Sequence, residues 1–394
     1  MTDGAKNGPS SLVSVLRCGE YSSSLLVPAV RRCLEHVGFD PASFKNARVA
    51  VKPNLLRATV PERAVVTHPE FFKAVVSVIK SEGGTPFVVE SPGFESPAKV
   101  LEKAAYLDFI RDEKIELWDN HSTRVLHNEE GEKFKRFEVA SMVFDADIIV
   151  NLPKMKTHSL TVMTGAVKNL FGTIPGLEKS KWHMRARDRE QFAGFLLDLY
   201  GTFLRGFNPP KKIIHIMDGV LAMEGDGPGP RGTPRKAGYI IAGLDAIAVD
   251  TVMAAIAGFK PGTIPLIDMG GRRGLGAGAM GKIDIRGDGI ADGLSPFKAP
   301  DMAGNTSALS RVLNGSFMKN MLVERPVPSA ERCTLCYQCR RICPAGAITP
   351  ARDGEQVPRY DYGRCIRCYC CMEICPEAAI GLKKGTLQWL LNMV

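Results

Sequence analysis

Apolar and polar positions alternate along most of the chain between strand-like and helix-like segments. Ser11–Arg17 has the character of a short strand, and apolar residues from Leu25 to Val37 recur at helical spacing before Gly38, a suitable C-cap. Ala47–Val51 predicts a buried strand. Later strands are predicted at Pro86–Val89, Lys114–Trp118, Asp147–Leu152, Lys211–Met217 and Gly238–Ala242, and helices at Pro69–Lys80 (capped by Thr67), Ala98–Asp108, Arg189–Leu204 and Asp245–Ala257.

This alternation predicts an α/β fold. Strands separated by helical segments favour a largely parallel sheet covered on both faces. We expect one large unit of this kind, in one or two lobes, up to about residue 304.

The C-terminal region carries a repeated cysteine pattern instead. Two runs have the form C-x2-C-x2-C-x3-C-P, and this spacing is typical of proteins with two [4Fe-4S] clusters. In such runs the fourth cysteine binds the other cluster. The predicted ligand sets are Cys333, Cys336, Cys339 and Cys375 for one cluster, and Cys365, Cys368, Cys371 and Cys343 for the other.

Other uses of these cysteines fit less well. Zinc accepts C-x2-C pairs, but two complete four-cysteine runs with matching prolines are not expected of a zinc ribbon. Disulfides need an oxidising compartment, and the N-terminal residues have no export signal. Cys370 is either a small packed residue or an alternative ligand.

These patterns divide the chain into five parts. We expect a disordered polar segment at 1–10, the α/β domain at 11–304 and a helix with a linker at 305–328, where Pro326 and Pro328 mark the join. A small α+β two-cluster ferredoxin-like domain at 329–384 and an apolar tail at 385–394 complete the plan.

Charge and composition narrow the partners. The formal charge of +9 falls to about +5 once two oxidised clusters with their thiolates are included. A mildly basic surface suits a small anionic substrate or a redox partner protein, whereas the scattered basic residues form no nucleic-acid module. No stretch approaches the ~20 apolar residues of a membrane span, and we expect a cytoplasmic protein.

Polar residues of the large domain gather after its predicted strands. Because ligands bind beyond the carboxyl ends of parallel strands, these residues are expected to form a substrate site. The candidates are Lys52, Asn54, Thr67, His68, Lys154, Lys156, Asn169, Asp218, Glu224 and Asp226.

Lys168, His158 and His183 are the candidates for chemistry. Lys168 lies in GAVKNLFG, where a desolvated amine with a lowered pKa would act as a base or covalent anchor. The histidines would transfer protons or bind a metal, although a lone histidine is more often structural. With Lys52, Lys154 and Lys156, Lys168 would also bind a carboxylate or phosphate, unless these lysines are solvated surface charges.

The large domain resembles the DUF362 family over roughly residues 11 to 300. The matching segments are KPN at 52–54, THPE at 67–70, NLPKMKTH at 151–158, GAVKNLFG at 165–172 and DGVLAMEGDGPGPRG from 218. Members of this family are often fused to a two-cluster ferredoxin.

A more distant resemblance connects the same domain to lactate racemase-like enzymes. Those enzymes carry a nickel-pincer nucleotide on a lysine that follows a histidine, and His158 and Lys168 have the same spacing. His183 follows where a metal-ligating histidine is expected. The THPE segment lacks the arginine of the corresponding racemase segment. The resemblance implies a shared fold and leaves open a further cofactor in the α/β domain.

Two functions fit these features. The first is an iron–sulfur oxidoreductase that passes electrons through the clusters to or from a substrate or cofactor in the cationic cleft. The second is a non-enzymatic electron carrier or assembly factor that docks a partner protein, favoured by the absence of flavin and nicotinamide motifs.

Overall fold

The computed structural model describes residues 10–91, 95–118, 122–176, 178–186, 188–291, 295–300 and 324–383. Our expectations for residues 1–9, for the helix predicted from residue 306 and for the tail at 385–394 lie outside these ranges. No helix in the described ranges combines the length and apolar character that crossing a membrane requires.

One continuous ten-stranded sheet organises the large domain. Its order is β12-β1-β11-β10-β7-β2-β3-β4, with β8 beside β10 and β9 beside β8. Most neighbours run parallel, as predicted; β11 and β9 pair antiparallel with their neighbours. The strands are β1 (Ser11–Arg17), β2 (Arg48–Pro53), β3 (Thr85–Val88), β4 (Glu116–Leu117), β7 (Ile148–Leu152), β8 (Lys154–His158), β9 (Val162–Thr164), β10 (Lys212–Gly225), β11 (Gly232–Gly243) and β12 (Ile283–Gly287). A separate hairpin joins β5 (Thr123–His127) to β6 (Arg136–Ala140).

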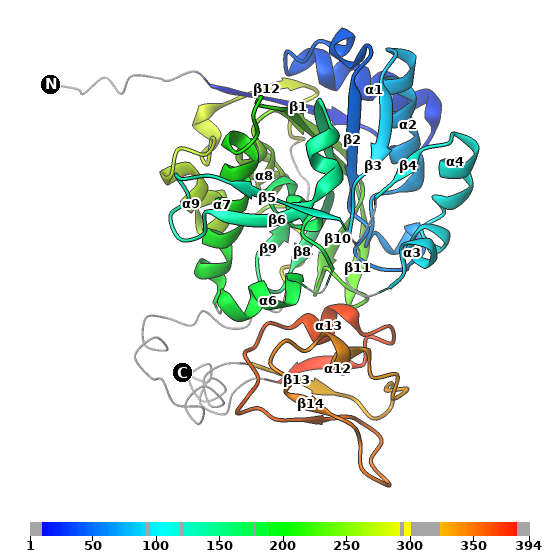
Figure 1. The fold of residues 1–394 in the computed structure, drawn as a ribbon, viewed down its shortest axis with the longest axis vertical. Coiled ribbons are helices and arrows are strands. Elements are labelled where there is room, and N and C mark those ends of the chain that lie inside the picture. Colours follow the sequence, from blue (N-terminus) through cyan, green and yellow to red (C-terminus); the bar gives the residue numbers. More distant parts are fainter. Residues whose placement is uncertain are drawn as a thin grey trace, which may run out of the picture.

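Two groups of helices flank this sheet (Figure 1). One group contains α1 and α2, which contact each other and strands β1, β2, β3 and β11. The other group contains α8, which contacts β1 and β11 and also helices α5 and α9. The helices are α1 (Ser23–His36), α2 (Pro69–Ser81), α3 (Pro97–Lys103), α4 (Leu107–Asp112), α5 (Ala166–Asn169), α6 (Glu178–Arg185), α7 (Arg189–Arg205), α8 (Ala246–Ile256) and α9 (Pro265–Arg272).

Three local predictions were wrong. The helix predicted at Ala98–Asp108 is two helices, because Ala105 has a left-handed φ of 59° between them. The α2 N-cap is His68 rather than Thr67. Strand β10 continues past Asp218 to Gly225 and forms a hairpin with β11, with a bulge between Gly219 and Leu221. Asp218 resembled a strand end in sequence but is buried inside the strand.

The C-terminal module is small and separate in sequence. Strand β13 (Arg325–Pro328) pairs with β16 (Ile380–Lys383), and β14 (Ile348–Thr349) pairs with β15 (Arg359–Tyr360). The two short helices are α12 (Gln338–Ile342) and α13 (Cys370–Ile374). The prolines expected in a linker thus belong to β13, in a two-stranded sheet where an edge position tolerates them.

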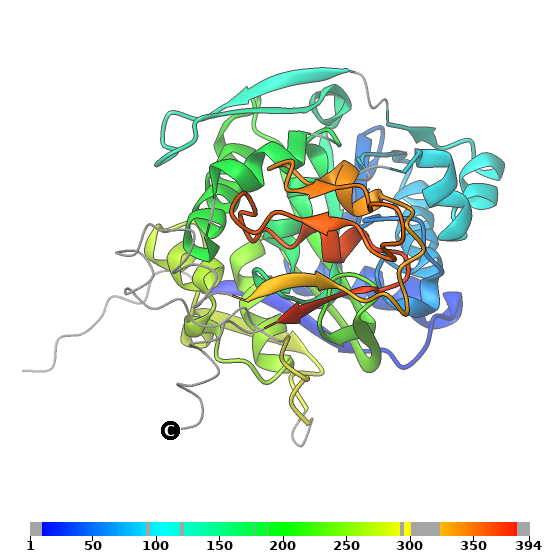
Figure 2. The same cartoon turned by 90° about the horizontal axis from the view of Figure 1, so that it is seen from below.

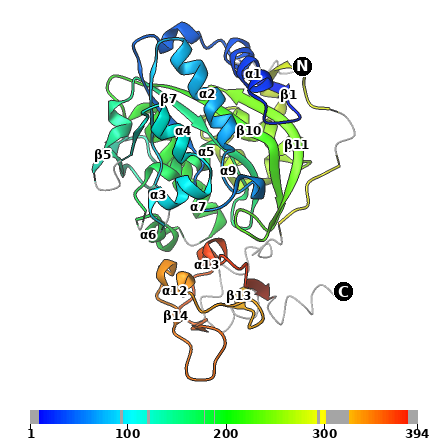
Figure 3. The ribbon, with the colours of Figure 1, turned by 90° about the vertical axis from the view of Figure 1, so that its right-hand side faces the viewer.

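The module lies against one edge of the large sheet, the edge formed by the carboxyl ends of its parallel strands. Helix α13 faces the ends of β8, β10 and β11, and the side view shows the same arrangement (Figures 1 and 3). Viewed from below, the module covers the middle of this edge (Figure 2). This is the edge at which the predicted polar residues gather.

Candidate functional site

Three neighbouring parallel strands place buried polar side chains in one row. The register pairs Lys52 of β2 with Asn151 of β7, and Asn151 with His215 of β10. All three side chains are at most 1% exposed. The KPN and NLP segments therefore meet at the carboxyl ends of their strands, where sites of α/β proteins form.

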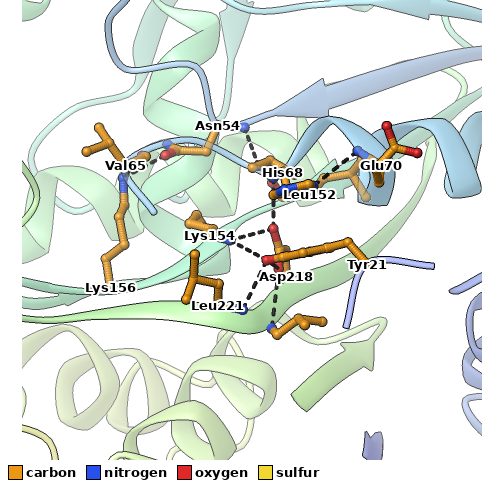
Figure 4. A network of polar contacts seen from close by, with 12 residues as sticks. Tyr21, Asn54, Val65, His68, Glu70, Leu152, Lys154, Lys156, Asp218 and Leu221 are labelled. Atoms are coloured by element: carbon orange, nitrogen blue, oxygen red, sulfur yellow. Dashed lines mark hydrogen bonds and ion pairs between the residues drawn. The ribbon is translucent and has the colours of Figure 1, made fainter. Parts of the chain in front are cut away.

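Asp218 connects β10, Lys154, Tyr21 and the start of α2 (Figure 4). Lys154 Nζ donates to Asp218 Oδ2 at 2.7 Å, and neither side chain is exposed. The Tyr21 hydroxyl donates to Asp218 Oδ1 at 2.7 Å, and the His68 backbone N–H donates to Oδ2 at 2.9 Å. These contacts engage both carboxylate oxygens, so the geometry favours a structural role for Asp218 over the predicted orientation of substrate.

Thr67 and His68 also stabilise the site from within. The Thr67 hydroxyl donates to Leu152 O at 2.7 Å and accepts the Asn54 N–H at 2.9 Å. The His68 ring stacks on Tyr21 at 3.6 Å between centroids, and burial lowers the pKa of His68 to about 4. A neutral, stacked imidazole suits packing better than substrate binding.

A chain of amide contacts fixes the centre of the site. Asn169 donates to Asn151 Oδ1 at 2.8 Å and to Lys52 O at 3.1 Å. Asn54 donates to Asn169 Oδ1 at 3.0 Å and accepts from Lys156 Nζ at 2.7 Å. The predicted substrate residues Asn54 and Asn169 therefore position one another and Lys156.

Lys52 is neutralised by a partner that the sequence analysis missed. Its ammonium forms an ion pair with Glu90, and the two side chains are 1% and 4% exposed. Glu90 follows β3, so the rule that placed Lys52 at a strand end could also have found it. Lys52 and Lys154 thus each have a buried carboxylate partner. Of the four lysines predicted to bind an anion, this leaves Lys156 and Lys168.

Lys179 of α6 joins this remaining pair. Its ammonium donates to Ser91 O, and burial together with the Lys168 charge lowers its pKa to about 7. Burial also lowers the pKa of Lys156 and of Lys168, and the Lys168 charge adds to the effect on Lys156. Lys179 follows no predicted strand and lies in none of the sequence motifs. Tertiary packing, which the sequence pattern does not show, brings α6 to the site.

Lys168 is held by the start of α5. The Asp250 carboxylate accepts the N–H groups of Ala166 and Val167 at 2.5 and 3.2 Å. Gly165 precedes this helix, and a Cβ there would lie 2.0 Å from Asp250 Oδ1. The glycine in GAVKN therefore permits a close approach that fixes the direction of α5 and of Lys168.

The C-terminal module contributes Glu373 to the site. His158 Nε2 lies 3.4 Å from Glu373 Oε1, while His158 Nδ1 accepts the Leu160 N–H at 3.0 Å. Burial raises the pKa of Glu373, and the charges of Lys168 and Lys156 oppose that shift. A carboxylate from the cysteine-rich helix therefore lies among the lysines and His158 of the α/β domain.

The other predicted residues are Glu224 and Asp226, which lie at the β10–β11 hairpin, and His183. Glu224 pairs with Arg235 at 2.7 Å and accepts the Lys298 N–H at 3.0 Å in the β10–β11 hairpin. Asp226 pairs with Arg231 at 3.0 Å and lines an interdomain cavity with Glu373. The His183 backbone belongs to α6, but its side chain is not among the described ones.

The eight predicted cluster cysteines line two cavities. One is lined by Cys333, Cys336, Cys339 and Cys375, and the other by Cys343, Cys365, Cys368 and Cys371. Each cavity thus gathers three cysteines of one run and the fourth of the other, as the spacing predicted. Cys370 lines neither cavity.

The surroundings of these thiols fit iron–sulfur clusters. The backbone N–H of Ala347 donates to Cys343 Sγ at 3.3 Å, and that of Ala379 donates to Cys375 Sγ at 3.2 Å. Such N–H···S bonds stabilise the charge on cluster ligands. Among the described side chains, no three His, Cys, Asp or Glu groups converge as ligands of a single metal ion. A [4Fe-4S] cluster does not require such convergence, because its four thiolate ligands bind four separate iron atoms.

Comparisons with known proteins agree with this division. Residues 49–255 match the family model "Domain of unknown function (DUF362)", and residues 325–376 match a 4Fe-4S dicluster domain. A thylakoid-associated protein of Synechocystis sp. is 35% identical over 265 residues, which cover 67% of this chain and 79% of that protein.

Solved structures show more distant similarity. A Thermotoga maritima structural-genomics protein has a TM-score of 0.39 at 11% identity, covering 62% of this chain and 61% of that one. The lactate racemase apoprotein from Thermoanaerobacterium thermosaccharolyticum has a TM-score of 0.40 at 10% identity, covering 65% and 59%. With its strand-end motifs and two cysteine-lined cavities, the chain belongs to the DUF362 family and carries a 4Fe-4S dicluster domain that binds iron–sulfur clusters.

Proposed function

We propose that this protein is an iron–sulfur oxidoreductase whose clusters exchange electrons with an anionic substrate held by Lys156, Lys168 and Lys179. The observation that carries this proposal is the position of Glu373. Helix α13 contains a cluster cysteine, Cys371, and places Glu373 within the electrostatic reach of Lys168 and Lys156. The cluster-bearing helix therefore forms one wall of the lysine site.

The charges favour a substrate with more than one negative charge. Lys52 and Lys154 have their own buried carboxylates, whereas Lys156 and Lys168 share Glu373 and Lys179 donates to a backbone carbonyl, Ser91 O. Burying unpaired ammonium groups is costly, and a bound carboxylate or phosphate would remove that cost. Lys168 and Lys179, whose pKa values burial lowers, are suited to donate and accept protons during electron transfer.

The module would exchange electrons with a redox partner protein at its outer surface. We place the protein in the cytoplasm, supported by the finding that none of its eleven cysteines forms a disulfide. The alternative function, a carrier that docks a partner without chemistry, predicts that the lysine site binds no small anion.

Anion titration of the dithionite-reduced protein, followed by electron paramagnetic resonance (EPR), tests the proposal. Succinate and orthophosphate serve as probes, since contact with α13 should make the cluster signal sensitive to a bound anion. We expect Lys168→Met to weaken the binding of the active probe at least tenfold without changing cluster absorbance. Lys73→Met is the matched control, because Lys73 lies on α2 in an ion pair with Glu70.

Two results would contradict the proposal. One is a cluster signal that neither probe changes, accompanied by a stoichiometric protein partner in anaerobic pull-downs, which would favour the carrier. The other is loss of cluster absorbance in Lys168→Met, which would make Lys168 a structural residue.

A further inference from the structure

Arg57 connects the α/β domain to the backbone of the cluster ligands. It lies in the segment after β2, and its side chain is only 5% exposed. One guanidinium nitrogen, Nη1, donates to Glu373 O at 3.2 Å and to Cys375 O at 3.3 Å. Cys375 lines the cavity of the first ligand set, so Arg57 approaches that cluster from the other domain.

The charge of Arg57 is not cancelled at close range. No carboxylate lies within 4.0 Å of its guanidinium among the described residues, and the Glu95 carboxylate acts on it only from farther away. The thiols of Cys375 and Cys336, both of the first set, are within its electrostatic reach. A guanidinium remains protonated even when buried.

We infer that Arg57 raises the reduction potential of the cluster held by Cys333, Cys336, Cys339 and Cys375. Reduction adds one electron and hence one negative charge to that cluster. A fixed positive charge nearby stabilises the reduced form, and charge and hydrogen bonding around the ligands are what set cluster potentials. The α/β domain thereby tunes one of the two clusters through a residue of its own.

Redox titration of the anaerobic holoprotein, followed by EPR, tests this inference in the absence of substrate. In Arg57→Gln we expect one of the two midpoint potentials to fall, with a change of up to about tenfold in the reduction equilibrium, or about 59 mV for one electron. The other midpoint should stay in place. Arg57→Lys, which retains the charge, should restore most of the shift.

Arg63→Gln is the matched control. Arg63 lies nearby on the chain and donates to a backbone carbonyl, Pro230 O at 2.7 Å, but is exposed. Unchanged midpoints in Arg57→Gln, an equal shift of both midpoints, or an Arg57→Lys variant as low as Arg57→Gln would overturn the inference. Because no substrate is present, such a failure would leave the proposed anion site untouched.

Discussion

At the residue scale, five lysines gather in the candidate site, of which Lys52, Lys154 and Lys156 are buried and Lys168 and Lys179 are half-buried. Two of them, Lys52 and Lys154, have dedicated carboxylates, and Lys156 and Lys168 share Glu373. A buried ammonium without a partner loses its proton more easily, because a low-dielectric environment disfavours the charged form. The distribution of carboxylates therefore separates Lys52 and Lys154 from the lysines that we propose bind an anion.

Lys179 should react as an unusually neutral amine. With a pKa of about 7, about three-quarters of its amine is unprotonated at pH 7.5, against about one in a thousand for an ordinary lysine. Neutral amines acylate, so labelling of Lys179 by trace acetic anhydride should rise through a midpoint near pH 7. Mass spectrometry of the digested holoprotein measures it, with the exposed Lys45 as an internal reference.

The variant Lys168→Met provides a second test of the lowered pKa of Lys179. The Lys168 charge lowers the pKa of Lys179, so its removal should move the labelling midpoint to higher pH. An Lys179 midpoint above pH 9 in the wild-type protein would show that the site is open to water and would remove the argument for a desolvated amine.

At the scale of elements, the two cysteine runs fold as equivalent halves. Tyr337 and Tyr369, each in a left-handed conformation, precede α12 and α13, and Leu335 and Arg367 also have positive φ at equivalent positions. Left-handed turns at non-glycine residues are uncommon and persist where surrounding contacts impose them. Cluster ligation supplies such contacts in both halves.

Crossed ligation predicts which cluster a cysteine variant loses. Cys375→Ser should remove the cluster of the first run although Cys375 belongs to the second, because it lines the cavity with Cys333, Cys336 and Cys339. We expect iron and sulfide content to fall by about half after anaerobic purification. Cys370→Ser is the control and should retain both clusters; equal losses in the two variants would exclude this ligand assignment.

At the scale of the whole molecule, the turn between β10 and β11 takes part in the docking of the two domains. Gly229 in the hairpin turn lies under α13, where a Cβ would be 2.9 Å from Glu373 O. Arg231 donates to Ile380 O at 3.3 Å from the same turn. The glycine-rich turn between β10 and β11 is thus part of the surface on which the module rests.

Gly229→Ala should loosen this docking. Its methyl group meets backbone rather than a flexible side-chain end, so the module has to shift. Limited proteolysis should release the module faster, while cluster absorbance stays unchanged. Gly262→Ala is the control because a Cβ at Gly262 meets nothing within 4 Å. Equal proteolysis rates for the two variants would show that the turn at Gly229 does not stabilise the docked module.

Much of this protein could be predicted from local patterns. The limits of β1 matched the prediction, α1 and α7 differed by one or two residues, and the parallel order of the central strands was correct, because periodicity records which faces a chain buries. The α3–α4 break and the length of β10 were missed. A left-handed alanine and a buried aspartate are set by tertiary contacts that propensity does not contain.

The candidate site divides in the same way. Cysteine spacing and strand periodicity are local properties, so they were enough to predict the two cluster ligand sets and the strand ends that carry Lys52 and Lys154. Tertiary packing, in contrast, pairs Glu90 with Lys52, brings Lys179 close to Lys168, and places Glu373 and Arg57 across the boundary between the domains. Burial, pairing and pKa depend on which distant residues share a low-dielectric space, and that follows from packing alone.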